Sequence, residues 1–151
     1  MRFQHRWRSL ERIDRALRRK PLPFDALEFA PMRVLVVADA GWVRGEVAAA
    51  SSGFELFEEI DPTNAVAACE DINPDAVIVD LQVGSMGGMA VTRSLRDAIF
   101  AQRIQDTVII LLLDRSADVF IAGRSGADAW LVKPFTPQQL RTVLTPVPAA
   151  D

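Results

Sequence analysis

The sequence holds a single cysteine, a single histidine and no tyrosine among its 151 residues. Because Cys69 stands alone, an internal disulfide and a metal site built from cysteines are both excluded. His5 lies in an arginine-rich N-terminal arm, so no nucleophile–histidine–acid set is expected. We expect Cys69 to pack as a small apolar residue on a helix and His5 to be an ordinary surface residue of the arm. Neither residue indicates catalysis.

A long apolar run is also missing. No stretch approaches the roughly 18–20 apolar residues that a membrane-spanning helix needs. The N-terminus is rich in arginine, but no apolar stretch follows it, so the pattern is not that of a secretory signal. We therefore expect no membrane span and a cytoplasmic location.

Lysine is scarce, since Lys20 and Lys133 are the two lysines against fifteen arginines. The rest of the composition is that of one globular domain, with half of the residues apolar and a quarter charged. The net charge of −3 hides an asymmetry, because residues 1–32 carry +4 and residues 33–151 carry −7. A basic arm and an acidic body are expected to do different jobs.

The basic arm forms its own segment, residues 1–31. Phe3, Trp7, Leu10 and Leu17 recur at helical spacing, which predicts a helix over 1–20. Three prolines then predict an irregular connector to residue 31. The helix has three candidate roles: a solvated extension, a helix that docks on the rest of the domain or on a second copy, or a contact with nucleic acid or membrane.

From Met32 onward, short apolar runs alternate with helical patterns. The most apolar of these runs, 107–113, is typical of a strand buried on both faces. The expected strands are 33–38, 54–60, 75–80, 107–113 and 128–132, and the expected helices are 43–50, 61–71, 89–102, 117–124 and 136–144. Five strand–helix units in series predict an α/β fold, a doubly wound five-stranded parallel sheet in the flavodoxin-like order 2-1-3-4-5.

Charged side chains follow several of these strands at the carboxyl end, where ligands sit in such sheets. Asp39 follows the first strand, Asp80 ends the third, Asp114 follows the fourth and Lys133 follows the fifth. Paired aspartate oxygens suit a hard cation such as Mg²⁺. A lysine beside them offers a positive charge for a phosphoryl group.

Three motifs on these strand ends resemble the receiver domain of response regulators. The stretch MRVLVVADAGWVR (32–44) is similar to the opening strand of the family, and DLQVGSMGGM (80–89) to its phosphoacceptor loop. GADAWLVKPF (126–135) is closely similar to the closing strand and its Lys-Pro-Phe turn, and implies a cis peptide bond before Pro134. The resemblance covers residues 32–145, with a short tail at 146–151.

The resemblance implies a role for each matching residue. Asp80 would be the nucleophile that accepts a phosphoryl group from a phosphohistidine. Asp80, Asp39 and the backbone carbonyl of Gln82 would bind Mg²⁺. Lys133 would bind the phosphoryl oxygens and stabilise charge in the transition state. Trp130 would be the aromatic switch residue, which turns inward or outward on activation.

The sequence departs from the family pattern at four positions. Ala38 replaces the first of two acidic residues, so we expect weaker Mg²⁺ binding. Leu113 stands where the family has a switch Thr or Ser, and it cannot bond a phosphoryl group; Ser116 is a candidate substitute. Asp114 replaces a small residue, and its carboxylate would repel a phosphoryl anion, point to solvent or assist the metal. Gly84 replaces a proline of the loop, which should make the loop more mobile.

The resemblance implies a single-domain response regulator in a two-component phosphorelay rather than an enzyme. A histidine kinase or phosphotransfer protein would phosphorylate Asp80, and a downstream protein would bind the face that includes Ile121, Trp130 and the helix 138–144. A homodimer is plausible, and DNA binding is not expected because no output domain follows residue 145.

Two other functions remain open. The alternative to a phosphoacceptor is a pseudo-receiver, an adaptor that binds its partner without phosphorylation. A small flavodoxin-like enzyme or nucleotide binder is disfavoured, because the sequence has no glycine-rich phosphate loop of the Rossmann or P-loop type.

Overall fold

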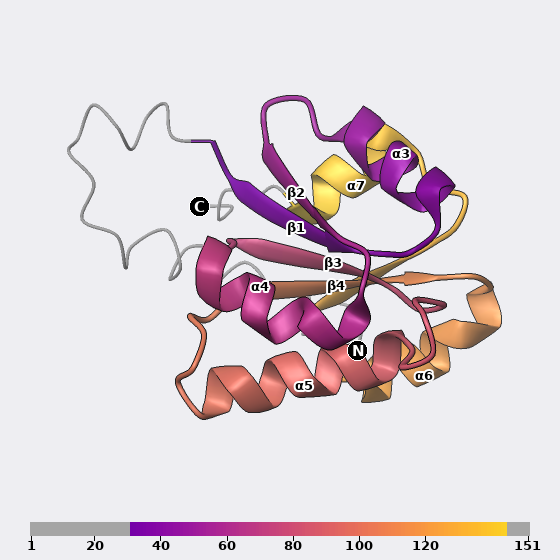
Figure 1. The fold of residues 1–151 in the computed structure, drawn as a ribbon. Helices are drawn as coiled ribbons and strands as arrows, with labels where there is room; N and C mark the ends of the chain where they lie inside the picture. Colours follow the sequence, from indigo (N-terminus) through magenta and orange to yellow (C-terminus); the bar gives the residue numbers. More distant parts are fainter. Residues whose placement is uncertain (1–30, 145–151) are drawn as a thin grey trace, which may run out of the picture.

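The computed structural model describes residues 31–144 (Figure 1). The helix predicted over 1–20, the connector up to residue 30 and the tail 146–151 lie outside the described residues. The described elements are, in chain order, β1 (Arg33–Val37), α3 (Gly41–Ala50), β2 (Glu55–Glu59), the 3-10 turn η1 (Pro62–Asn64), α4 (Ala65–Ile72), β3 (Ala76–Asp80), α5 (Gly88–Phe100), β4 (Val108–Leu113), the 3-10 turn η2 (Ser116–Asp118), α6 (Val119–Arg124), β5 (Ala129–Val132) and α7 (Pro137–Leu144).

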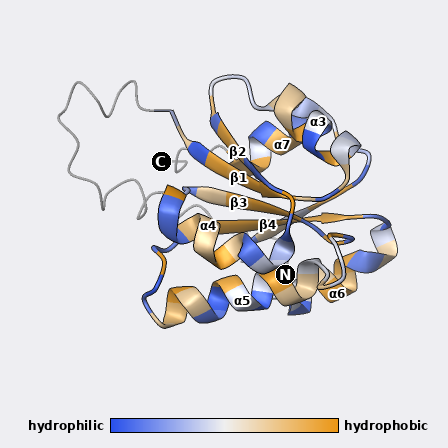
Figure 2. Cartoon of the chain, viewed as in Figure 1, coloured by the Kyte–Doolittle hydropathy of each residue, from blue (hydrophilic) through white to orange (hydrophobic). Residues whose placement is uncertain are grey.

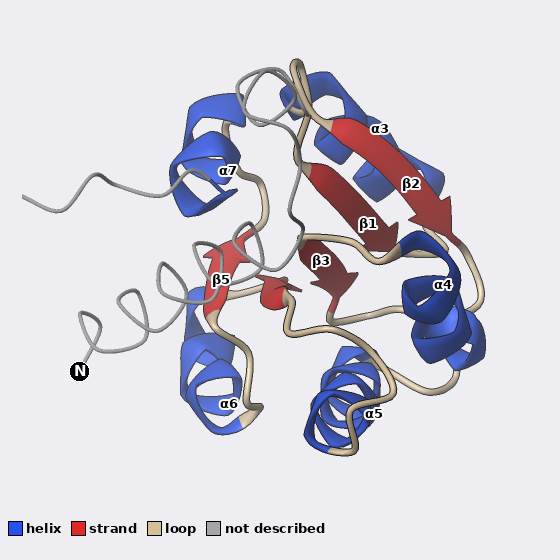
Figure 3. Cartoon of the chain, turned by 90° about the vertical axis from the view of Figure 1, so that its left-hand side faces the viewer, coloured by secondary structure: helices blue, strands red, loops and turns tan. Residues whose placement is uncertain are grey.

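The five strands form one parallel sheet in the order β2-β1-β3-β4-β5. This confirms the predicted doubly wound, flavodoxin-like architecture. Helices α3 and α7 cover one face of the sheet, and α4, α5 and α6 cover the other (Figure 3). Among the described helices, none is both long and apolar enough to cross a membrane.

The core lies on both faces of the two central strands. All six residues of β4 and all five of β3 are buried, which explains their nearly continuous apolar sequence. Because successive side chains of a strand point to opposite faces, Leu111 packs under α4 and α5 whereas Leu112 packs under α3 and α7. Figure 2 shows the apolar strands between helices whose outer surfaces carry the polar residues.

Several boundaries differ from the sequence prediction. The helix predicted over 61–71 is divided into η1 and α4, and Asp61 caps the turn by accepting a hydrogen bond from the backbone N–H of Thr63 at 2.9 Å. The helix predicted to reach Gln102 ends at Phe100, because Gln102 has a left-handed backbone with φ of 59°. The helix predicted over 117–124 likewise begins with a 3-10 turn, η2. These are changes of helix ends, and the order of elements is as predicted.

Candidate functional site

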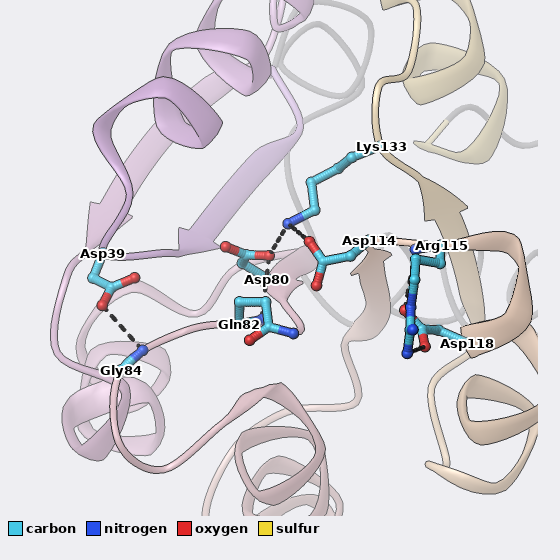
Figure 4. A network of polar contacts seen from close by, with 8 residues as sticks. All are labelled: Asp39, Asp80, Gln82, Gly84, Asp114, Arg115, Asp118 and Lys133. Carbon is cyan, nitrogen blue, oxygen red and sulfur yellow. Dashed lines mark hydrogen bonds and ion pairs between the residues drawn. The ribbon is translucent and has the colours of Figure 1, made fainter.

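The parallel sheet brings the predicted site residues to one edge. Asp39, Asp80, Asp114 and Lys133 all follow or end strands whose carboxyl ends lie side by side (Figure 4). Strands β1 and β3 are neighbours in the sheet, yet α3 and α5, which follow them, pack on opposite faces. A crevice is expected at this point of a doubly wound sheet. The predicted convergence of these side chains at one place is therefore present.

Asp80 lies at the centre of the site. Its residue is 1% exposed, and its Oδ1 atom accepts a hydrogen bond from Nζ of Lys133 at 2.6 Å. The backbone N–H of Gln82 is 3.4 Å from the same oxygen. In Figure 4, the other carboxylate oxygen of Asp80 points toward Asp39. The buried carboxylate thus has one oxygen held by a cation and the second one directed toward Asp39.

Lys133 connects two carboxylates. Its Nζ atom lies 2.6 Å from Oδ1 of Asp80 and 2.8 Å from Oδ1 of Asp114, and the residue is 8% exposed. Burial opposes protonation, but the hydrogen bonds and negative charges of Asp114 and Asp80 outweigh it and raise the pKa of Lys133. The lysine is therefore held in its charged form between the two acids.

The backbone around Lys133 fixes its approach. The N–H of Lys133 donates to the carbonyl of Leu113 at 2.7 Å, which ties the end of β5 to the end of β4. The Lys133–Pro134 peptide bond is cis, as the resemblance implies. Phe135 is then buried with the cluster under α3 and α7. The Lys-Pro-Phe turn anchors the lysine by packing as well as by hydrogen bonding.

Asp39 is exposed and lies on the side of Asp80 opposite to Lys133. Its Oδ2 atom accepts a hydrogen bond from the backbone N–H of Gly84 at 3.1 Å. Gly84 has a φ of +47°, and a Cβ atom there would lie 2.9 Å from Cγ of Pro62. Glycine is thus required by both the backbone angle and the space. The replacement of the family's proline therefore places a donor beside Asp39.

The loop after β3 also passes very close to Asp80. A Cβ atom at Gly88 would lie 2.6 Å from the carbonyl oxygen of Asp80, closer than real Cβ atoms come. The start of α5 can therefore approach the end of β3 only because residue 88 is glycine. This is the physical reason for the third glycine of the motif at 80–89.

Leu113 and Trp130 occupy the two positions predicted for the switch. Leu113 is fully buried in the cluster under α4, α5 and α6, and it has no polar group to offer the site. Trp130 is half-buried, pairs with Leu111 across the sheet and packs against the same cluster. Whether Trp130 changes its orientation stays a prediction.

Asp114 points into the site rather than to solvent, and it pairs with Lys133. Burial of the carboxyl opposes ionisation, but the hydrogen bond and charge of Lys133, helped by Gln82 and Arg115, lower the pKa of Asp114. Ser116, the candidate substitute for the missing hydroxyl, begins the exposed turn η2.

Sequence reasoning missed two residues beside the site, Trp42 and Arg44 on α3. The guanidinium of Arg44 donates to the carbonyls of Ala38 and Asp39, at 3.0 and 2.8 Å, and forms an ion pair with Glu58 at 3.6 Å. The exposed ring of Trp42 has its centroid 5.4 Å from Nζ of Lys133. No sequence motif indicates either contact, because both depend on how α3 packs beside the ends of the strands.

Cys69 does not contribute to the site. It is buried on α4, and burial raises the pKa of its thiol to about 12. The expectation of a small packed residue is therefore confirmed.

The oxygen atoms at this edge suit a hard divalent cation. Among the described residues, no group of three or more His, Cys, Asp or Glu side chains forms a complete metal site. Mg²⁺ does not need one, because it takes one or two carboxylates and keeps several water molecules. Asp39 and the Asp80 oxygen that points toward it are such a pair of carboxylates.

Comparison with known proteins gives a consistent result. The family model of the response regulator receiver domain matches residues 34–145. The DNA-binding response regulator MtrA of Mycobacterium tuberculosis is 32% identical over 110 residues, which are 72% of this chain and 46% of that protein. The chain spans about half the length of the curated relatives it matches.

Solved structures agree in fold. The chemotaxis response regulator CheY4 of Vibrio cholerae aligns with a TM-score of 0.66 and 25% identity, over 76% of this chain and 97% of that one. The receiver domain of the sensor histidine kinase PA1611 of Pseudomonas aeruginosa, with a magnesium ion in its active site cleft, aligns with a TM-score of 0.65 and 24% identity, over 76% and 95%. The sequence motifs, the strand order, the convergent acids and lysine and these matches agree, and the chain belongs to the response regulator receiver domain family of two-component signalling.

Proposed function

We propose that this domain accepts a phosphoryl group on Asp80 from the phosphohistidine of a histidine kinase or a phosphotransfer protein. The observation that carries the proposal is the buried Asp80 carboxylate, held by Lys133 at 2.6 Å with Asp39 beside it at the neighbouring strand end. The site signals by changing charge rather than by turning over a substrate. We therefore place the protein among signalling modules and not among enzymes with a released product.

The transfer needs one bond formed and one broken. An oxygen of the Asp80 carboxylate attacks the phosphorus atom, and the P–N bond of the phosphohistidine breaks. The electron pair of that bond stays on the imidazole nitrogen of the donor, and Asp80 becomes an acyl phosphate. Lys133 binds a phosphoryl oxygen, which stabilises the charge that spreads over these oxygens in the transition state.

The proposed ligands of Mg²⁺ are the Asp80 oxygen that points toward Asp39, the carboxylate of Asp39 and the backbone carbonyl of Gln82. When bound, the ion would neutralise charge on the phosphoryl oxygens and align them with Asp80. Arg44 fixes the backbone of Asp39, and the N–H of Gly84 orients its side chain. Because Ala38 leaves the set one carboxylate short, we expect Mg²⁺ affinity below that of receivers with an acidic pair.

We further propose that the phosphorylated domain signals through a protein partner on the α6–β5–α7 side. Ile121 on α6 is exposed there, and Trp130 on β5 lies between the two helices in sequence. A homodimer through this face and a cytoplasmic location stay predictions.

The test is phosphorylation by a small donor. We expect the protein, incubated with Mg²⁺ and phosphoramidate, to gain the mass of one phosphoryl group in intact mass spectrometry. Asp80→Asn should abolish the gain, and Asp39→Ala should make it much slower. Asp97→Asn, the same chemical change at an exposed position of α5, is the matched control and should react like the wild type.

The opposite result has a clear meaning. If the wild type gains no mass and Mg²⁺ leaves its tryptophan fluorescence unchanged, Asp80 is not a phosphoacceptor. The protein would then act as the phosphorylation-independent adaptor, and the search would turn to a partner of the unmodified surface.

A further inference from the structure

Asp114 is the feature of the site that the proposed reaction does not use. Its Oδ1 atom lies 2.8 Å from Nζ of Lys133, nearly as close as Asp80 at 2.6 Å. Figure 4 shows Lys133 between the two carboxylates, with Asp114 on the side away from Asp39. The one lysine that would bind a phosphoryl oxygen is therefore already shared with a second anion.

We infer that Asp114 is a positioning residue that competes with the phosphoryl group for Lys133, and that its carboxylate leaves the lysine when Asp80 is phosphorylated. The inference rests on the proposed function, since it concerns the lysine that the transfer would use. In the unphosphorylated domain, Asp114 would therefore keep Lys133 bound to its own carboxylate.

The charges support displacement. An aspartyl phosphate adds negative charge to Asp80, a residue that is nearly fully buried. An inward Asp114 would then face this charge across a single ammonium group, and like charges at such short range repel strongly where water is excluded. Lys133 also gains a stronger partner in the phosphoryl oxygens than it has in the carboxylate of Asp114. Both effects drive Asp114 away.

The present position of Asp114 also allows it to leave. Its side chain is 32% exposed, whereas that of Asp80 is 2% exposed, so an outward path to solvent is open. Its Oδ2 atom is buried and accepts no hydrogen bond of ordinary geometry within the described part of the chain, although Gln82 lies beside it. When the carboxylate of Asp114 turns outward it loses its bond to Lys133, but water can then bond the oxygen that lacks a partner inside.

The movement would compensate for Leu113. A buried leucine cannot form the hydrogen bond by which a hydroxyl would draw the end of β4 toward the phosphoryl group. Asp114 begins the loop that leads through Arg115 to η2, and the backbone N–H of Arg115 donates to the carboxylate Oδ2 of Asp118 at 3.0 Å. Repulsion between Asp114 and the phosphoryl group would therefore move the loop that a hydroxyl at residue 113 would move by attraction.

The experiment compares initial phosphorylation rates over a range of phosphoramidate concentrations. Freeing Lys133 in Asp114→Ala and Asp114→Asn should raise the rate at low donor concentration on the order of ten-fold, the worth of one charge-assisted hydrogen bond. The gain should appear mainly as a lower donor concentration at half-maximal rate. Asp114→Glu, which keeps the charge, should stay close to the wild type, and Asp97→Asn is the matched control.

The gain must also depend on the lysine. In a Lys133→Met background, Asp114→Ala should no longer increase the rate. A ten-fold gain that persists without Lys133 overturns the inference, because Asp114 would then act through its charge alone. Equal rates for the wild type, Asp114→Ala and Asp114→Asn overturn it as well, while phosphorylation of Asp80 would stand. Labelling of Asp114→Ala but not of the wild type supports competition for Lys133 and contradicts phosphorylation of the unaltered domain, and no labelling of any variant rejects both proposals.

Discussion

At the scale of single residues, the site depends on glycines as much as on its charged groups. Gly84 donates its N–H to Asp39, and Gly88 lets the start of α5 lie against the backbone of Asp80. The sequence motif contains both glycines, but it does not indicate why these two positions require glycine. The backbone angle at Gly84 and its contact with Pro62 arise from the way η1 meets the β3–α5 loop.

We predict that Gly84→Ala destabilises the protein more than Gly53→Ala. Both positions have a positive φ, which costs about 1–3 kcal/mol for a residue with a side chain. At Gly84 the new methyl group would also meet Pro62 at 2.9 Å, whereas nothing lies within 4 Å at Gly53. Chemical denaturation should show the difference, and Mg²⁺ titration should show weaker binding for Gly84→Ala. Equal stability and equal binding would contradict the assigned role of Gly84.

The place of a residue at this edge could be predicted from the sequence where it follows from a strand. Asp80 ends β3 and Lys133 follows β5 in a parallel sheet, so their meeting at one edge follows from topology. The pairing of Asp114 with Lys133 does not follow, since an inward, an outward and a metal-assisting side chain were equally compatible with the pattern. Arg44 was missed because its bonds beside Asp39 are to backbone carbonyls, which the sequence does not indicate.

At the scale of elements, α5 is fastened to the sheet by a buried ion pair. Arg96 lies 2.7 Å from Oδ2 of Asp128 and donates a second hydrogen bond to the carbonyl of Gly126 at 2.6 Å. Asp128, 4% exposed, also accepts the backbone N–H of Ile109 at 2.8 Å. The pair therefore joins α5, β4 and the start of β5 at the end of the sheet away from the site.

We predict that Arg96→Met lowers the free energy of unfolding by about 3 kcal/mol, because it removes the partner of a buried carboxylate. Arg103→Met, in the turn that follows the same helix, is the matched control. Arg103 pairs with Glu70 at 2.6 Å, but both side chains are well exposed, so its replacement should cost less than about 1 kcal/mol. Urea denaturation of the two variants measures both values. Equal losses would show that burial does not distinguish the two pairs.

The ends of the helices are the part of the secondary structure that could not be predicted from the sequence. The apolar pattern located each strand and helix because it follows burial on one or both faces. It could not separate η1 from α4 or find the left-handed turn at Gln102, because these depend on local hydrogen bonds that many sequences can form.

At the scale of the whole molecule, one sheet separates two apolar clusters. Leu111 belongs to the cluster under α4, α5 and α6, and Leu112 to the cluster under α3 and α7. Both residues are fully buried and adjacent on β4. Because both clusters share the same strands, neither can lose its packing without disturbing the other.

We predict that Leu111→Ala and Leu112→Ala each lower the free energy of unfolding by about 2–5 kcal/mol, the usual cost of a cavity in a core. Each variant should still unfold in one cooperative transition, followed by circular dichroism and by tryptophan fluorescence. Phe100→Ala is the control, because its side chain is 91% exposed and its loss should change stability by less than about 0.5 kcal/mol. Two separate transitions would show that the clusters are independent.

The parallel sheet has a consequence for how the chain reaches this structure. Within residues 31–144, no two neighbouring strands are joined by a hairpin, and even the shortest strand pairing there, that of Ile110 with Ala129, joins residues nineteen positions apart. Each pairing must therefore close a long loop before its contacts form, which slows folding relative to a helical bundle of equal size. Until β3 and β5 pair with β4 on either side, the apolar residues of β4 are exposed and can associate with other unfolded chains. The topology that gathers the acids and the lysine at one edge thus makes the domain sensitive to crowding while it folds.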